Sequence, residues 1–494
     1  MKFLAIGLVV LCAAAMAVAA AEPDLIFVNA RIRTMDTKKP TAEAVAVSGG
    51  LISAVGTNAE IRRLASDRTQ VVDAGGKLLI PGFNDAHVHF AGVGNWFSHL
   101  DATNIKDSKG LLDRIARFAR FLPKGRWILG AKLASSSIPS QKELDAVSSE
   151  HPVLIYLKDP AFALVNSATL DAASLRIGDD PVVSGVSLQR VRNSIPKNNS
   201  TNWAEITEAA SNYAASLGVT SVQDVHSDNL LSTYRRMAAS GKLKTRIYEC
   251  VGLGDWEKDH SIGLKAATGD AMVRGGCVKW FADGSVEERF ELGKRIAEAD
   301  KAGLQVMIHA IGSRASKNTI DAFQYATSKN GRRDRRFRVE HAHKIANLDT
   351  VRLSRLSIIA SMQPALFYRD GDAGDNFSFI FRSGTKVAFG SDASMIDIDP
   401  MQGIHSAVNS KSGSVSVETA VAAYTIGSAY AEFQEDVKGS ISVGKLADLV
   451  LLSDDIFTMR STDINRTKVE KTIVNGRVVY DAKCELQPRF ECKN

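Results

Sequence analysis

The stretch Leu78–His89, which reads LLIPGFNDAHVH, decides how this chain is interpreted. An apolar run in it leads into two histidines, His87 and His89, that are separated by one residue. Because side chains alternate between the two faces of a strand, both imidazoles would point to the same side, as two ligands of one metal ion must. Two solvated histidines at a strand end would show the same pattern, so the choice between these alternatives depends on the rest of the chain.

Four more residues that suit a metal site lie within, at or near the end of their own apolar runs. They are Lys279, His309, His341 and Asp392. A (β/α)8 barrel gathers its functional side chains in this way, at the C-terminal ends of several parallel strands. Taken one at a time, each has an ordinary explanation: a lysine whose ammonium group reaches solvent, two core histidines and an aspartate that caps a helix. Their order along the chain, after the histidine pair, favours one shared site.

The pattern between residues 112 and 392 is typical of βα units. Apolar strand-like runs, among them Trp127–Gly130 and Val153–Leu157, alternate with helical patterns and suffice for a barrel of eight strands. Both ends of the chain are instead rich in short strands and tight turns, including Asn475–Gly476, a dipeptide typical of a β-hairpin. We therefore expect a small β-domain assembled from the two termini beside the barrel.

The length and composition fit this architecture. The chain has 494 residues, of which 45% are hydrophobic and 23% are charged, which suits one large barrel and a smaller domain. The net charge of +6 is spread along the sequence, and the densest basic run, Arg332–Arg336, has no aromatic residues between its arginines. We interpret that run as a solvated loop and expect no nucleic-acid partner.

The first residues are typical of a secretory leader. Lys2 precedes an apolar run, Phe3–Val18, and the small residues Ala19–Ala21 stand before Glu22. The run is short for a membrane anchor, no positive charge follows it directly, and no later segment is apolar enough to span a bilayer. We therefore expect cleavage after residue 21 and a mature protein that is secreted or periplasmic and not bound to a membrane.

The cysteines divide into two pairs once Cys12 leaves with the leader. Cys250 and Cys277 end or begin apolar strands, where we expect buried thiols. Cys484 and Cys492 lie close together in a polar tail, and an exported protein meets an oxidising environment, so we expect a disulfide between them.

Four stretches of the sequence resemble one known family. Pro81–His89 (PGFNDAHVH) is similar to the first-strand signature of the amidohydrolase superfamily. Val278–Ser285 (VKWFADGS), Gly303–Gly312 (GLQVMIHAIG) and Gly439–Asp448 (GSISVGKLAD) narrow the resemblance to the N-substituted formamide deformylase-like, or YtcJ-like, metal-dependent hydrolases. The similarity covers nearly the whole mature chain, and the four motifs together are specific.

The resemblance implies an α/β fold, a distorted TIM (β/α)8 barrel with a small composite β-sandwich built from both termini. The implied division is a signal peptide at 1–21, the first part of the sandwich at 22–80, the hydrolase barrel at 81–435, the second part of the sandwich at 436–483 and a C-terminal tail at 484–494. The two parts of the sandwich would meet only in space, because the barrel separates them in sequence.

The resemblance also implies a metal site. By position, the implied ligands are His87, His89, Lys279, His309, His341 and Asp392. The first two histidines and Asp392 would bind the more buried metal, a carbamylated Lys279 would bridge to an outer metal, and the last two histidines would hold that outer metal. His341 is preferred to the nearby His343 because the pair Glu340–His341 matches the family. Two zinc ions per chain are implied, with other divalent metals left open.

Such a site implies hydrolysis of a small molecule. A metal-bound hydroxide would attack a carbonyl carbon, because a metal ion lowers the pKa of its water from about 16 to about 7. Asp392, as the catalytic residue, would accept the proton and pass it to the leaving group. The expected substrate is a small amide-type molecule cleaved at a C–N bond other than a peptide bond, and an ester or a cyclic amide is less favoured.

The chain departs from the family pattern at residues expected near the substrate. It has Asp159–Ala161 (DPA) where Asp-Gly-His is usual, no histidine directly after Ser361–Pro364, Ser313 in place of an aspartate, and a short connection at 284–302. The chemistry therefore carries over and the substrate does not. Two alternatives stay open, a non-catalytic binding protein on a decayed barrel and a metal-dependent lyase or isomerase. A homo-oligomer is compatible with the sequence.

Overall fold

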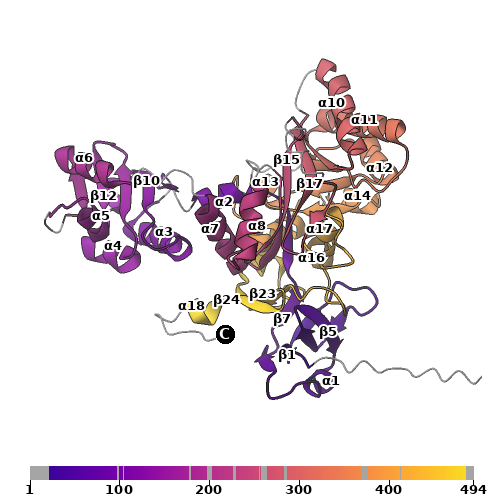
Figure 1. The fold of residues 1–494 in the computed structure, drawn as a ribbon, viewed down its shortest axis with the longest axis horizontal. Coiled ribbons are helices and arrows are strands. Elements are labelled where there is room, and N and C mark those ends of the chain that lie inside the picture. Colours follow the sequence, from indigo (N-terminus) through magenta and orange to yellow (C-terminus); the bar gives the residue numbers. More distant parts are fainter. Residues whose placement is uncertain are drawn as a thin grey trace, which may run out of the picture.

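Eight parallel strands form a nearly closed barrel at the centre of the chain (Figure 1). In hydrogen-bonded order they are β8 (Phe83–Val88), β14 (Val219–Asp224), β15 (Arg246–Gly252), β17 (Val273–Phe281), β18 (Gln305–Ile311), β19 (Arg338–His343), β20 (Ile359–Met362) and β21 (Val387–Phe389). A short strand, β16 (Thr268–Gly269), pairs antiparallel with β17 outside this order. β21 lies beside β8, with no ladder pairing between them among the described strands. The predicted distorted (β/α)8 barrel is confirmed.

The computed structural model describes residues 22–485 except for 97–98, 104, 177, 179, 197–202, 226–229, 255, 257–263, 283–285, 370–376 and 412. The predicted leader at residues 1–21 and the residue Cys492 lie outside the described residues. The leader and the disulfide between Cys484 and Cys492 therefore stay predictions. Among the described helices, none is long and apolar enough to cross a membrane.

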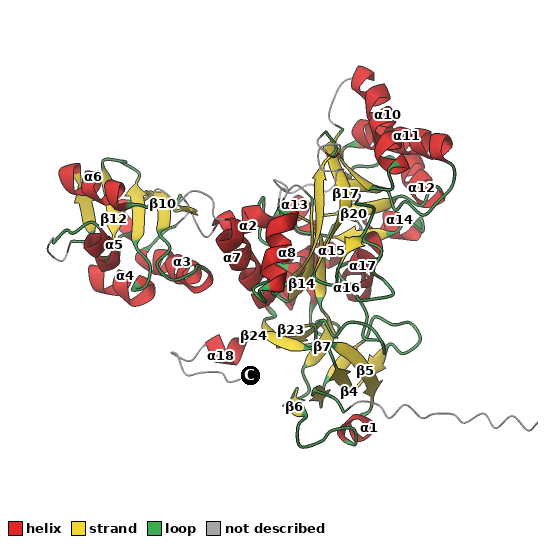
Figure 2. Cartoon of the chain, in the orientation of Figure 1, coloured by secondary structure: helices red, strands yellow, loops and turns green. Residues whose placement is uncertain are grey.

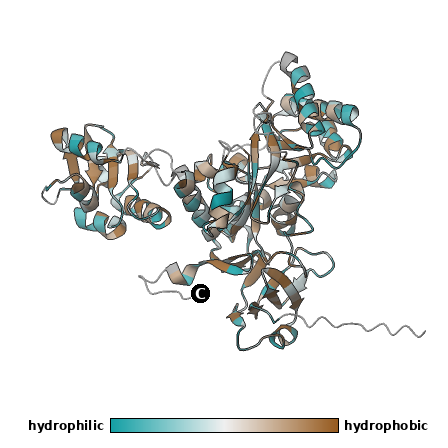
Figure 3. Cartoon of the chain, viewed as in Figure 1, coloured by the Kyte–Doolittle hydropathy of each residue, from teal (hydrophilic) through white to brown (hydrophobic). Residues whose placement is uncertain are grey.

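Helices cover the outside of the barrel, as Figure 2 shows. They are α2 (Phe90–Trp96), α7 (Trp203–Ser216), α8 (Leu231–Ala239), α10 (Val286–Lys301), α11 (Ser313–Asn330), α12 (Asn347–Arg355), α13 (Pro364–Arg369), α14 (Phe377–Arg382), α15 (Pro400–Val408), α16 (Val417–Ala423) and α17 (Ile426–Ala431). Strand residues such as Val278, Ile308 and Val339 pack with apolar helix residues in one large core. Figure 3 shows the matching division, with apolar strands and with many polar residues on α10 and α11.

Two further sheets form the β-domain, which contains both ends of the described part of the chain. One sheet has the order β5 (Leu51–Gly56), β4 (Ala44–Ser48), β1 (Leu25–Val28) and β6 (Gln70–Asp73), and α1 (Asn58–Arg62) packs against it. The other has the order β24 (Arg477–Asp481), β23 (Val469–Val474), β22 (Leu449–Leu452), β7 (Leu78–Pro81), β2 (Arg31–Arg33) and β3 (Thr41–Ala42), and α18 (Ala482–Glu485) follows β24. Because β22 pairs with β7, the predicted composite β-sandwich is confirmed. The hairpin at Asn475–Gly476 is confirmed as well, and both residues have positive φ.

Residues between β8 and β14 form a separate five-stranded sheet that was not predicted (Figure 1, left). Its order is β13 (Val182–Ser184), β12 (Phe162–Val165), β11 (Val153–Leu157), β10 (Ile128–Leu133) and β9 (His99–Asp101), with helices α3 (Ser108–Phe121), α4 (Gln141–Ser148), α5 (Ser167–Ala172) and α6 (Gly185–Ser194). The prediction that Trp127–Gly130 and Val153–Leu157 provide barrel strands is wrong, because these segments pair with each other in this sheet. An apolar run indicates a buried strand but not the sheet that it joins.

A buried ion pair ties the barrel to the β-domain. Arg246 on β15 donates from Nε and Nη2 to the two carboxylate oxygens of Asp448, at 2.6 and 2.8 Å. Both side chains are 4% exposed, and Asp448 also accepts a hydrogen bond from the backbone N–H of Asn475 at 2.9 Å. Removing one partner of such a buried, two-pronged pair is strongly destabilising, so the pair holds the two domains together.

The structure corrects two further predictions, one about a pair of cysteines and one about the basic run. Cys250 and Cys277 are not thiols but form a disulfide, because the parallel pairing of β15 with β17 places them opposite each other. The run Arg332–Arg336 is a loop, as predicted, but it is solvated only in part, because Arg335 is buried and Arg336 is half-buried. Two of its arginines, Arg333 and Arg335, donate from Nε to one oxygen of the buried Asp300, at 3.0 and 2.8 Å. A buried carboxylate needs such partners, and the sequence did not show that these arginines supply them.

Candidate metal centre

The seam between the first and last barrel strands brings predicted ligands together. Asp392 lies in the loop after β21, and its backbone N–H donates to the carbonyl oxygen of His87 at 2.8 Å. The N–H of His89 donates to the carbonyl oxygen of the residue after Asp392 at 2.5 Å. Nearby, the N–H of Ser391 donates to a carboxylate oxygen of Asp85 at 3.0 Å. These bonds hold Asp392 beside the histidine pair.

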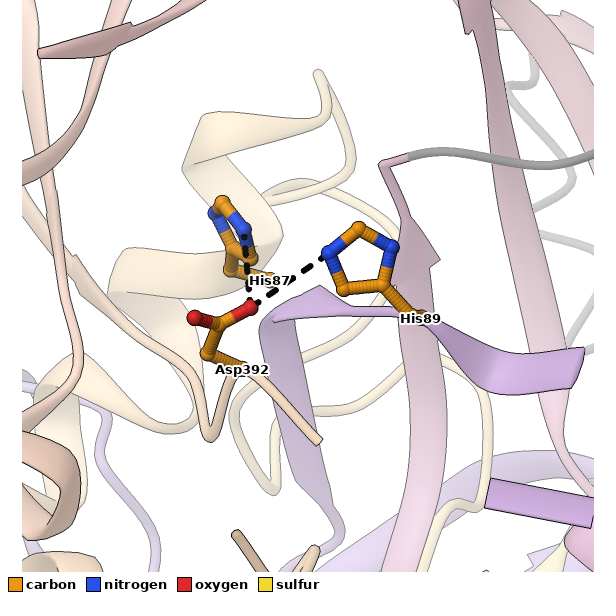
Figure 4. A group of neighbouring side chains, drawn as sticks. All are labelled: His87, His89 and Asp392. Carbon is orange, nitrogen blue, oxygen red and sulfur yellow. Dashed lines mark ion pairs between the residues drawn. The ribbon is translucent and has the colours of Figure 1, made fainter. Parts of the chain in front are cut away.

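His87, His89 and Asp392 form a compact group of donor atoms, and Figure 4 shows both rings beside the carboxylate. Asp392 Oδ1 lies 3.4 Å from Nε2 of His87 and 3.5 Å from Nε2 of His89. One donor atom of each residue lies within 4.8 Å of the others. This spacing is compatible with one metal ion bound by all three residues.

The other predicted ligands lie around this group. The ring centroid of His341 is 4.7 Å from that of His87, and Nδ1 of His341 is 4.0 Å from Oδ2 of Asp392. The ring centroid of His309 is 4.3 Å from that of His341. Lys279, near the C-terminal end of β17, is buried and lies close enough to interact electrostatically with His87 and His341. The structure therefore gathers all six residues at one end of the barrel, and their roles as ligands stay a prediction.

Two buried ring nitrogens in the group need an explanation. His87 Nε2 and His341 Nδ1 have no hydrogen-bond partner within the part of the chain that the structure describes. Nearly all buried polar atoms in proteins are hydrogen-bonded, so such nitrogens next to a carboxylate are unusual. Imidazole nitrogens and a carboxylate oxygen are a common donor set for zinc. The residues present therefore fit a divalent metal.

The protonation states of Asp392 and His341 suit a cation. Burial by itself would raise the pKa of Asp392, but the interactions with His87 and His89 hold that pKa well below its usual range. Burial and the charge of His87 lower the pKa of His341 well below its ordinary value. At neutral pH Asp392 is ionised and His341 is neutral, which are the forms in which these groups bind metals.

One alternative raised by the sequence does not fit the structure. Asp392 is not a helix cap, because the helix that follows it, α15, has Asp399 as its N-cap. Asp392 and His341 both have positive φ, at 61° and 71°, a conformation that is uncommon outside glycine and clusters at functional sites. His343, the other candidate for the position of His341, stacks on Phe367 with ring centroids 3.9 Å apart.

The sequence analysis missed four buried polar residues close to the site. Glu340 Oε2 lies 2.5 Å from Nδ1 of His87, and Arg338 Nε donates to Glu340 Oε1 at 2.7 Å. Asp85 is fully buried, and burial raises its pKa to about 6. Gln363, directly after β20, is also fully buried, and neither polar atom of its side chain has a hydrogen-bond partner among the described residues. The one available signal was the alternation of charged and apolar residues in the run that contains Arg338 and Glu340.

Comparison with known proteins agrees with this fold. The chain matches the amidohydrolase family over residues 70–480 and belongs to that family of hydrolases. The solved structure of an uncharacterized metal-dependent hydrolase from Pyrococcus furiosus has the same fold. Its TM-score with this chain is 0.63 at 24% sequence identity, over 88% of this chain and 100% of that one.

Three relatives show which members of the amidohydrolase family this chain resembles. Protein LONG AFTER FAR-RED 3 from Arabidopsis thaliana is 30% identical, over 92% of this chain and 91% of the relative. The putative amidohydrolase YtcJ from Bacillus subtilis is 26% identical, over 91% and 98%. N-substituted formamide deformylase from Arthrobacter pascens is 25% identical, over 93% and 98%. The predicted resemblance to the YtcJ-like amidohydrolases is confirmed.

Replacing Gln363 tests whether the C-terminal end of the barrel is built to hold a ligand. Ser361, on the same face of β20, accepts a hydrogen bond from Arg338 inside the barrel at 3.2 Å, so Gln363 faces the same interior nearer the C-terminal end. An unpaired buried amide costs about 1–3 kcal/mol, so we expect Gln363→Leu to raise the free energy of unfolding by about 1 kcal/mol and to raise KM. Urea unfolding and steady-state kinetics measure the two effects. A less stable variant with unchanged KM would show that Gln363 is structural.

Proposed function

We propose that the chain is a metal-dependent amidohydrolase that cleaves a C–N bond, other than a peptide bond, in a small amide-type molecule. The observation that carries this proposal is the donor group of His87, His89, His341 and Asp392, with its two unpaired buried nitrogens, at the C-terminal end of the barrel. The choice of an amide-type bond is supported by the relative from Arthrobacter pascens, whose name states that it deformylates N-substituted formamides.

The metal and Asp392 have different roles in the proposed reaction. A bound divalent metal supplies a nucleophilic water at neutral pH and polarises a carbonyl oxygen. Asp392 handles the proton: its Oδ1 lies beside the histidine pair, while its Oδ2 lies on the side of His341. Its low pKa keeps it ionised, which is the form that can accept a proton. The protonated carboxyl would then pass the proton to a leaving nitrogen.

We further propose two zinc ions per chain, bridged by a modified Lys279. Imidazole and carboxylate donors suit zinc, and other divalent metals bind the same set. An ammonium group cannot link two cations. If the amine of Lys279 adds to carbon dioxide and loses a proton, the carbamate that forms has two oxygens, one for each metal. The position of Lys279, buried near His87, His309 and His341, supports this role.

The proposed substrate carries an apolar group beside its amide bond. Exposed apolar residues lie at or just beyond the C-terminal ends of barrel strands, among them Phe281, Ile311 and Met395. The ring centroid of Phe281 is 4.9 Å from that of His309, so an exposed apolar side chain lies beside a predicted ligand. Small-molecule sites combine such apolar walls with a few polar groups that fix orientation. The proposed partner is therefore a small molecule, and neither a nucleic acid nor a membrane.

A non-catalytic binding protein is the second candidate function. It is favoured by the alanines and serine at positions where the family usually has polar groups, Ala161, Ala365 and Ser313. The plant relative, whose name states no activity, fits it as well. The full set of donor residues speaks for catalysis instead. A lyase or isomerase would use the same donors and would be recognised by its product.

Asp392→Asn tests the proposed reaction, because asparagine keeps the shape and an oxygen donor but loses the basicity. We expect metal content to stay near the wild-type value and kcat to fall by about 10²–10⁴, the usual contribution of general acid–base catalysis. A screen of amides and esters with metal-replete wild type provides the substrate. Wild-type turnover in Asp392→Asn would remove Asp392 from the mechanism. Metal binding without any turnover of wild type would favour the binding protein.

Lys279→Ala tests the bridge between two metals. We expect the variant to lose metal and activity, since the carbamate can no longer form, and to regain part of both in a short-chain carboxylate that can take its place. Elemental analysis gives the metal content per chain, and the assay above gives the activity. Full metal content and full activity in Lys279→Ala would contradict the binuclear site.

We propose that the protein is exported, which makes it secreted or periplasmic. The disulfide between Cys250 and Cys277 supports this, because such bonds persist in oxidising compartments and are rare in the cytosol. N-terminal sequencing of the exported protein is expected to begin at Glu22. Mature protein that keeps Met1 and stays inside the cell would contradict export.

A further inference from the structure

A continuous chain of buried polar side chains runs along the inside of the barrel and ends at His87. Barrel interiors are usually filled by apolar side chains, so this chain of polar side chains requires an explanation. From the N-terminal end of the barrel, its members are Lys438, Glu432, Asn84, Gln223, Arg338, Glu340 and His87. Each of these residues is at most 4% exposed, so none of them gains much from contact with water.

The lower half of this chain is anchored in the end of the barrel away from the site. Lys438 Nζ lies 2.8 Å from Glu432 Oε1, and Asn84 Nδ2 donates to the same oxygen at 2.7 Å. Gln223 Nε2 in turn donates to Asn84 Oδ1 at 3.4 Å. The amide oxygen of Gln223 accepts a hydrogen bond from Nη1 of Arg338. Arg338 is therefore tied to groups deep inside the barrel.

The upper half fixes Glu340 against His87. Arg338 Nε donates to Glu340 Oε1 at 2.7 Å, while Glu340 Oε2 lies 2.5 Å from Nδ1 of His87. Arg338 Nη2 also donates to the carbonyl oxygen of Ala86 at 2.5 Å and to Oγ of Ser361 at 3.2 Å. A planar guanidinium held by this many acceptors cannot turn, and it therefore holds the carboxylate of Glu340 in one place.

This contact decides which nitrogen His87 offers to a metal. An ionised carboxylate only accepts hydrogen bonds, so the nitrogen that faces Glu340, Nδ1, must carry a hydrogen. In the neutral ring the lone pair is then on Nε2. That nitrogen lies 3.4 Å from Asp392 Oδ1 and has no hydrogen-bond partner in the described chain.

We propose that Glu340, held by Arg338, is a positioning residue of the metal site that fixes the tautomer and ring orientation of His87. The inference rests on the proposed metal site, but it does not depend on the reaction. Glu340 acts through His87 and is not itself a ligand. Loss of such a carboxylate partner typically weakens metal binding by 10–100-fold.

The test measures zinc affinity and folding of the full mature protein. Competition with a chelator of known affinity gives the zinc Kd, and urea unfolding of the zinc-free protein reports stability. Glu340→Gln keeps the size of the side chain but offers only one accepting oxygen for two donors, Arg338 and His87. We expect its zinc Kd to rise by about 10–100-fold.

In Glu340→Gln, zinc affinity could fall because His87 loses its acceptor or because the charge of Arg338 is left unpaired. A second variant separates these two causes. Arg338→Met combined with Glu340→Leu removes both charges, and apolar replacement of a buried ion pair often leaves stability unchanged. We expect the same loss of zinc affinity. The matched control is Arg246→Met with Asp448→Leu, which removes an equally buried pair that ties the barrel to the β-domain. The control is expected to keep the wild-type zinc affinity.

The outcomes separate this proposal from the proposed function. Weak zinc binding in both Glu340 variants, with a normal control, supports the positioning role even if no hydrolysis is ever found. Wild-type affinity in either folded Glu340 variant overturns it, since the acceptor is then not needed. Equal weakening in the control overturns it too, because any lost buried pair would then weaken the site. A wild-type protein that binds no divalent metal removes both proposals.

Discussion

The closure of the barrel at the seam between β8 and β21 is the constraint on which the candidate site depends. The other neighbouring strands of the barrel are joined by ladders, whereas the seam is joined by the loop after β21, through backbone bonds to His87 and His89. A further bond, from Ser391 to Asp85, links residues that are 306 positions apart. The same bonds place Asp392 beside the histidine pair. The hydrogen bonds that close the barrel therefore also set the geometry of the donor group.

Two of the predicted ligands lie next to supports of different character. The buried polar chain on β8 and β19 ends at His87. Between β15, β17 and β18, the disulfide of Cys250 and Cys277 packs together with Met307. His309 lies two residues beyond Met307 on β18. The two proposed metals would therefore rest on unlike supports, one set by hydrogen bonds and the other by packing.

Burying so many charges is costly, and the structure limits the cost by pairing them. Arg338 with Glu340, and Lys438 with Glu432, each combine opposite charges inside the barrel. Buried pairs of this kind seldom add net stability compared with apolar residues of similar size. The stability of the fold must come instead from the large apolar core between strands and helices. What the polar chain contributes is a fixed orientation for the side chains at its upper end.

The sequence by itself determined the class of fold and singled out the residues that the structure gathers at the candidate site. His87 and His89 share a face because the alternation of a strand is local, and the hairpin at Asn475–Gly476 follows from two residues. Only the tertiary structure decided that Trp127–Gly130 belongs to a separate sheet, that Cys250 pairs with Cys277, and that Glu340 meets His87. The physical reason is the same in each case. Periodicity reports the conformation of one segment and the side on which it is buried, whereas a partner far away in sequence is chosen by how the segments pack.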